Sequence, residues 1–172
     1  DAPEVIDFDY YSNGGVGLTS ADVTGDGWPD LLAATDNTHH WFLVAGDGAG
    51  GFTAPRRFRT GDTPFRIVAP DLDSDGDLEV VVVARESMGA SVYVNPGDGA
   101  FVQPDPIDMT PATLAPAFPS NLEAGDIDAD GDLDLVLGYR SDFHSQDGIS
   151  VRRNLGDGTF APIEDYPEGV HP

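Results

Sequence analysis

The sequence contains no cysteine, and all eight of its Lys and Arg positions are arginine. Without cysteine, both disulfides and thiolate metal sites are excluded. Against the eight basic residues stand 31 Asp and Glu residues, so the formal net charge at pH 7 is −23. A field this negative repels nucleic-acid phosphates and anionic membrane surfaces, and it attracts cations. We therefore exclude nucleic acid as a partner.

Long apolar runs are also absent. None approaches the roughly 20 residues that a membrane-spanning helix needs, so we expect no membrane span. Yet 40% of the residues are hydrophobic, and a run such as Val80–Val83 requires a core in which to be buried, so the acidity does not indicate disorder. The chain begins with Asp1 and has no signal peptide. A mature secreted chain would look like this after cleavage, and so would a trimmed chain.

An acidic segment of nine residues occurs three times, at 22–30, 71–79 and 126–134. The starts of the three segments are 49 and 55 residues apart, a period in the range of propeller blades. Each segment has an acidic or hydroxyl residue at positions 1, 3 and 5, a glycine at position 6 and a carboxylate at position 9. The repetition indicates an array of similar units.

A second landmark follows each acidic segment. It is a Gly-Asp-Gly triplet followed by a phenylalanine, and the three copies are Gly46-Asp47-Gly48 with Phe52, Gly97-Asp98-Gly99 with Phe101, and Gly156-Asp157-Gly158 with Phe160. Glycines in such triplets supply the positive φ that a tight hairpin requires. Two landmarks in the same order, three times over, make the repeat a specific signal.

Short runs rich in β-branched residues lie between these landmarks, four to each repeat. In the second repeat they are Phe65–Ala69, Val80–Ala84, Ser91–Val94 and Pro106–Met109. No long 3.6-residue period appears, and this pattern favours strands over helices. Each repeat is therefore predicted to be a four-stranded antiparallel meander, which is one blade of a β-propeller.

The predicted fold is all-β, with residues 1–172 forming a single repeat array. The three blades are expected at 15–62, 63–112 and 113–172, and segment 1–14 is expected to be an unpaired outer-type strand. Closed propellers usually have four to eight blades, so three blades form a partial propeller unless other chains or a longer parent complete it. We expect self-association or the remaining blades of a longer chain as partners, and head-to-tail pairing that does not close would give a filament.

The spacing of the acidic residues predicts a cation site in each loop. Oxygens at positions 1, 3, 5 and 9 gather on one side of a curled loop, and Ca²⁺ accepts irregular sets of six to eight oxygen ligands. Two carboxylates about 4 Å apart repel by roughly 4 kcal/mol at an effective dielectric near 20, a cost that a divalent ion removes. An EF-hand is excluded, because its position-12 glutamate is replaced by Ala33, Val82 and Leu137.

The D-x-D-x-D-G-x-x-D loop before an apolar strand, with N-x-G-D-G-x-F later in the repeat, resembles the FG-GAP/VCBS-type repeats of integrin α-subunit propellers, bacterial surface proteins and some lectins. The match runs from about Val16 to Tyr166. The resemblance implies a β-propeller with about three Ca²⁺ sites, one per repeat. The implied metal-ligating residues, with Trp28, Asp77 and Asp132 contributing main-chain carbonyls, are Asp22, Thr24, Asp26, Trp28, Asp30, Asp71, Asp73, Asp75, Asp77, Glu79, Asp126, Asp128, Asp130, Asp132 and Asp134.

The three loops depart from this pattern to different degrees. Thr24 replaces an acidic residue at position 3, so the first site is predicted to be the weakest. Glu79 replaces Asp at position 9, and its extra methylene either shifts this ligand or makes it bidentate. The third loop matches the pattern best.

These observations predict a non-enzymatic, extracellular or cell-surface scaffold, stabilised by calcium, for adhesion or assembly. The alternatives are a carbohydrate-binding lectin propeller and an accessory propeller of a larger secreted enzyme, so the ligand is a protein or a glycan. Trp28, Trp41, Tyr10 and Tyr11 could form a sugar-stacking surface, although aromatic packing between blades also explains them. We expect no catalytic residues, because the carboxylates within a loop lie too close in sequence to flank a cleft as the acid and base of a hydrolase.

Overall fold

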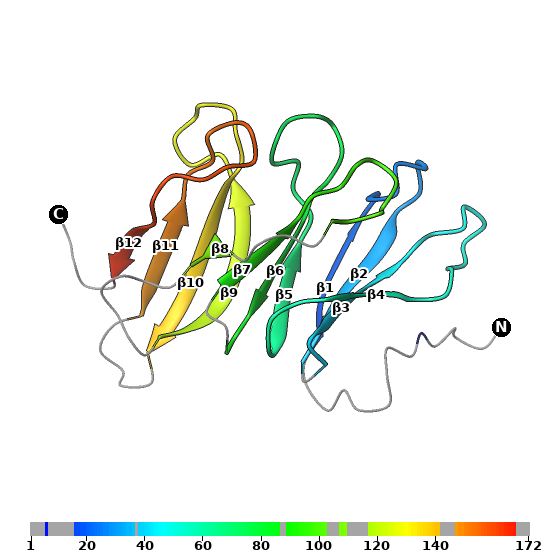
Figure 1. Cartoon of the computed structure of the whole chain (residues 1–172), viewed down its shortest axis with the longest axis horizontal. Coiled ribbons are helices and arrows are strands. Elements are labelled where there is room, and N and C mark those ends of the chain that lie inside the picture. Colours follow the sequence, from blue (N-terminus) through cyan, green and yellow to red (C-terminus); the bar gives the residue numbers. More distant parts are fainter. Residues whose placement is uncertain are drawn as a thin grey trace.

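The computed structural model describes residues 6, 16–36, 38–86, 89–102, 107–109, 117–141 and 147–167. In these ranges the regular elements are twelve strands, arranged in three four-stranded sheets. Figure 1 shows the three sheets side by side, in chain order across the molecule. The predicted fold class, an open array of antiparallel β-propeller blades, is confirmed.

Each sheet is a meander, because strands that follow one another in the chain are also neighbours in the sheet. The first sheet contains β1 (Val16–Ala21), β2 (Asp30–Thr35), β3 (His40–Val44) and β4 (Arg56–Arg59). The second contains β5 (Pro64–Val68), β6 (Val80–Ala84), β7 (Gly89–Tyr93) and β8 (Ile107–Asp108). The third contains β9 (Ala117–Gly125), β10 (Asp134–Ser141), β11 (Gly148–Arg152) and β12 (Glu164–Pro167).

The three sheets fall within the ranges 15–62, 63–112 and 113–172 that the repeat predicts for the blades. The outer-type strand predicted within 1–14 lies outside the described residues, apart from Ile6. Within the described part of the chain, no helix is long and apolar enough to cross a membrane.

The apolar strand after each acidic loop forms the core between sheets. All five residues of β6 are buried, and burying each valine side chain stabilises the fold by about 1.5–3 kcal/mol. One apolar cluster joins the first sheet to the second, and another joins the second sheet to the third. The middle sheet is therefore buried on both faces.

Trp41 belongs to this core. It has no exposed surface, and its ring stacks on Phe58 with the centroids 4.3 Å apart. The edges of Tyr93 and Phe101 meet the same indole. Trp41 therefore packs between blades and is removed from the candidate sugar-stacking residues.

Two buried asparagines connect neighbouring sheets at the acidic loops. Asn95 Nδ2 donates a hydrogen bond to the carbonyl of Val23 in the first sheet at 2.9 Å, and Asn154 Nδ2 donates to the carbonyl of Leu72 in the second sheet at 2.6 Å. Each asparagine also donates to a carbonyl of its own sheet. Val23 and Leu72 are the second residues of their acidic loops, so each of these two loops is held against the next blade. We call Asn95 and Asn154 the bridging asparagines.

The glycine-rich hairpin of the first blade is offset from the predicted alignment. The amide of Gly46 donates to Asp30 Oδ1 as the amide of Asn154 donates to the ninth residue of its own loop, so Gly46 is the counterpart of a bridging asparagine. Segment 48–50 then corresponds to 156–158, and the glycines at the ends of both segments have positive φ. The predicted equivalence of Gly46-Asp47-Gly48 with the later triplets is wrong by two residues, because the glycine-rich run 46–51 offers two alignments.

Candidate metal-binding loops

Each acidic loop connects the first two strands of its sheet, and Figure 1 shows the three loops along the same edge of the array. The sixth residues of the loops, Gly27, Gly76 and Gly131, have φ values of 87°, 96° and 102°. Residues with a Cβ rarely adopt this conformation. The predicted backbone reversal at position 6 is therefore present in all three loops.

The second loop brings three carboxylates together. One oxygen from each of Asp71, Asp73 and Glu79 lies within 4.8 Å of the other two. Backbone amides curl the loop around them, since the amide of Gly76 donates to Asp71 at 3.2 Å and the amide of Asp75 donates to Asp73 at 3.3 Å. The loop thus presents an oxygen-rich concavity of the kind that hard divalent cations prefer.

Two of these carboxylate oxygens are buried without a hydrogen-bond partner, Asp71 Oδ1 and Glu79 Oε1. Glu79 is 2% exposed, and its other oxygen accepts the amide of Leu72 at 2.8 Å. Leaving a buried acceptor unpaired costs about 1–3 kcal/mol, and more for a charged group. Burial raises the pKa of Glu79 and the charge of Asp73 raises it further, while the nearby amides of Leu72 and Asn95 act in the opposite direction. The second loop therefore fits a divalent cation, which would coordinate both oxygens and offset the local negative charge.

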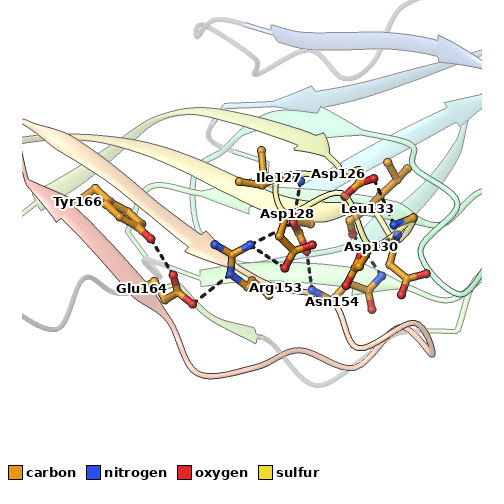
Figure 2. Close-up of polar contacts among 12 residues, drawn as sticks. Asp126, Ile127, Asp128, Asp130, Leu133, Arg153, Asn154, Glu164 and Tyr166 are labelled. Atoms are coloured by element: carbon orange, nitrogen blue, oxygen red, sulfur yellow. Dashed lines mark hydrogen bonds and ion pairs between the residues drawn. The ribbon is translucent and has the colours of Figure 1, made fainter.

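The third loop has the same ligand pattern but a different neighbour. Oxygens of Asp126, Asp128 and Asp130 lie within 4.8 Å of one another, and all three residues are exposed. Figure 2 shows the guanidinium of Arg153 directed at Asp128, with Nη1 2.8 Å from Asp128 Oδ2. Its Nε lies 3.2 Å from Glu164 Oε1 on β12. The hydrogen bond with Glu164, followed by the contact with Asp128, raises the pKa of Arg153 above its ordinary value.

The ninth residue of the third loop has a partner on each oxygen. Asp134 is fully buried, and it accepts the amide of Ile127 at 3.0 Å on Oδ2 and the amide of Asn154 at 2.9 Å on Oδ1. Arg153 Nη1 lies 4.0 Å from Asp134 Oδ2. At position 9, the carboxylate of the third loop therefore has hydrogen bonds and a nearby cation, whereas the carboxylate of the second loop has an unpartnered oxygen.

The first loop is hydrogen-bonded within itself. Asp30 is fully buried, with Oδ2 accepting the amides of Val23 and Thr24 at 3.0 Å and Oδ1 accepting the amide of Gly46 at 3.0 Å. Both oxygens of Asp22 accept loop amides as well. Residues 22–30 are all described, and their three carboxylates do not form a close group like those of the other loops. Of the three loops, the first is the least suited to a cation.

The side chains at position 7 lie over the glycine hairpins. A Cβ added to Gly97 would come within 2.6 Å of Asp77 Oδ2, and one added to Gly156 within 2.7 Å of Asp132 Oδ2. Trp28 takes the same place in the first blade, where a Cβ on Gly48 would come within 2.6 Å of its Nε1. The glycines therefore leave room for these side chains, a role that the sequence pattern did not indicate.

Trp28 remains half exposed, at 51%. Together with Pro29, Phe52 and the glycine-rich hairpin, it lines a hollow of about 350 Å³. An exposed indole beside a shallow hollow is a surface on which the apolar face of a ring can stack.

Sequence reasoning missed two features of the loops. Arg153 was missed because its approach to Asp128 depends on strand register, which the acidic motif does not contain. The fourth loop residues Ser74 and Ala129 have φ values of 60° and 63°, a left-handed conformation that costs a non-glycine residue about 1–2 kcal/mol. The available signal was Gly25, which occupies this position in the first loop with a φ of 69°.

Comparison with known proteins gives a family and a fold. A family model described as FG-GAP-like repeat matches residues 22–82 and 71–137. A solved structure of an Agrocybe aegerita lectin, described as showing specific recognition of non-reducing terminal N-acetylglucosamine, is similar with a TM-score of 0.57 and 20% identity. The alignment covers 87% of this chain and 37% of that one. Because the sequence identity is only 20%, the likeness concerns the fold alone. No match was found among curated proteins.

Proposed function

Because the chain belongs to the FG-GAP-like repeat family, we propose that it is a calcium-stabilised β-propeller module that acts as a non-enzymatic, extracellular scaffold for adhesion or assembly. The observation that carries this proposal is the pair of buried, unpartnered oxygens in the second loop, Asp71 Oδ1 and Glu79 Oε1. Burying charged oxygens without a partner is costly, and a cation site explains why the chain keeps them there.

The residues that would hold the ion in the second loop are the side chains of Asp71, Asp73, Asp75 and Glu79 and the main-chain carbonyl of Asp77. Calcium, when bound, supplies two positive charges and accepts six to eight oxygen ligands. Extracellular modules bind it with Kd values of about 10⁻⁴–10⁻³ M, a range that suits a secreted or cell-surface protein.

The second loop is also linked to the contact between blades. The amide of Leu72 donates to Glu79, and the carbonyl of the same residue accepts from the bridging asparagine Asn154. A rigid position for Glu79 therefore supports the contact between the second and third blades. This connection is the physical basis for a scaffold whose blade packing depends on calcium.

The test is thermal unfolding with calcium and with a chelator, on the full chain and on Glu79→Gln. Calcium at about 100 times Kd should stabilise the wild-type protein by about 2.7 kcal/mol, because only the folded state assembles the site. Glu79→Gln should lose most of this stabilisation by calcium. Magnesium at equal concentration should stabilise the wild-type protein less than calcium does. Equal melting temperatures for the wild type with calcium and with chelator would refute the proposal.

A second candidate function, glycan binding, is favoured by Trp28 and its hollow, with support from the N-acetylglucosamine recognition described for the similar lectin. A glycan array with the full chain tests it. Binding that Trp28→Ala abolishes, and that Tyr166→Ala, which removes an exposed aromatic side chain from the third blade, leaves unchanged, would support the lectin function. An array without signal would reject it.

A further inference from the structure

The three blades differ at the residue that faces the ninth position of the acidic loop. The last paired residues of the third strands are Val44, Tyr93 and Arg152, opposite the residues that follow the loops. The first residue after each of these strands is Ala45, Val94 and Arg153 respectively. Only the third blade therefore places a charged side chain at this position.

Arg153 is held from two sides (Figure 2). From the loop, Asp128 Oδ2 lies 2.8 Å from Nη1, and from β12, Glu164 Oε1 lies 3.2 Å from Nε. Tyr166 fixes Glu164 in turn, because its hydroxyl donates to Glu164 Oε2 at 2.8 Å. The guanidinium is thus oriented toward the loop by the outermost strand of the blade.

We infer that Arg153 acts as a built-in cation for the third acidic loop and makes this loop a weaker calcium site than the second, although its ligand pattern matches the family better. The inference rests on the proposed calcium binding by the second loop. The positive charge offsets the repulsion among Asp126, Asp128 and Asp130, and it repels an incoming divalent ion. It also occupies an oxygen of Asp128, the position-3 ligand.

Two properties of the chain follow from this arrangement. The third loop keeps its conformation without calcium, because Arg153 ties it to Glu164 on β12. The second loop has no such substitute, since Val94 is its counterpart residue. Calcium binding is therefore expected in two steps, a tighter one at the second loop and a weaker one at the third.

An orienting role for Arg153 would have the opposite effect on calcium affinity. Arg153 engages one oxygen of Asp128, and such a contact can orient the other oxygen toward a metal ion, as outer-shell partners of metal ligands do. In that case, removal of Arg153 would weaken the third site. The sign of the change in affinity therefore separates a competing cation from an orienting one.

The experiment is calorimetric titration of the full chain with Ca²⁺, comparing wild type with Arg153→Val, the residue found in the second blade, and with Arg153→Lys. Arg153→Val should tighten the weaker step about tenfold, the change expected on removing a unit charge close to the ligands of a divalent ion. Arg153→Lys should stay close to wild type. If the valine variant does not fold, Arg153→Gln replaces it, because glutamine keeps hydrogen-bonding capacity without charge. A weaker step that is unchanged or further weakened in the folded variant overturns the inference.

The reciprocal change is Val94→Arg, with Val94→Gln as the neutral polar control. Val94 is half exposed, so a longer side chain has room. Val94→Arg should weaken the tighter step about tenfold, and Val94→Gln should not. The proposed function is refuted if wild type shows no tight calcium-binding step, or if Glu79→Gln leaves that step intact. A tight step that behaves as expected while the Arg153 and Val94 variants do not refutes only this inference.

Discussion

The second and third acidic loops share one ligand pattern, yet their surroundings are different. The second residue of the second loop, Leu72, is 1% exposed because the third blade covers it, whereas its counterpart Ile127 in the third loop is 52% exposed. The second loop has unpartnered buried oxygens, and the third has Arg153. The next blade and the facing strand, more than the match to the motif, therefore decide how a loop of this kind is solvated and charged.

The same contrast extends over the faces of the two blades. Ala90 on the second blade has no exposed surface, whereas Ile149 at the corresponding position of the third blade is 44% exposed. In both pairs, the apolar residue that another blade covers is buried and its counterpart is exposed. Substitutions at covered and exposed positions test that difference.

Truncation of the covered residue should be much more damaging than truncation of the exposed one. Leu72→Ala removes a fully buried side chain and leaves a cavity between blades, so we expect a loss of about 2–5 kcal/mol in the free energy of unfolding. Ile127→Ala should cost less than about 1 kcal/mol, because about half of that residue already contacts solvent. Urea unfolding measures both changes, and equal losses would show that the two faces are equivalent in solution.

The bridging asparagine should contribute less than the apolar contact. Asn154→Ala leaves the buried carbonyl of Leu72 without its donor, for an expected loss of about 1–3 kcal/mol. Asn95→Ala, which removes the equivalent bond to Val23, is the matched variant and should show a similar loss. A loss below about 0.5 kcal/mol for both asparagines would mean that the bridges do not hold the blades together.

The smallest change in stability is expected at position 4, where the second and third loops share the same backbone conformation. Ser74 and Ala129 both have φ near 60°, so glycine at either position relieves backbone strain but increases the freedom of the unfolded chain. Ser74→Gly and Ala129→Gly should each stabilise the chelated protein by about 0.5–1 kcal/mol. Thermal unfolding measures this change, and destabilisation by either variant would mean that the left-handed conformation is not kept in solution.

The repeat made most of the fold predictable from the sequence. The period, the sixth-position glycines and the apolar runs determine where each blade turns and which strand is buried, and β6 has the predicted bounds. The bridging asparagines were visible as part of a motif, but their partners lie 72 and 82 residues away in the preceding blade. The contact of Arg153 with Asp128 depends on hairpin register, and the unpartnered oxygen of Glu79 depends on side-chain burial. Neither property is encoded by the spacing of acidic residues.

The most direct test of calcium binding by the second loop is a high-resolution crystal structure of the chain grown with calcium, with anomalous scattering used to identify the ion. We expect a fully occupied ion between Asp71, Asp73 and Glu79, bound by the two oxygens that lack hydrogen-bond donors. We expect lower occupancy at the third loop, rising in Arg153→Val. Water alone among the second-loop carboxylates, in a medium rich in calcium, would contradict calcium binding there.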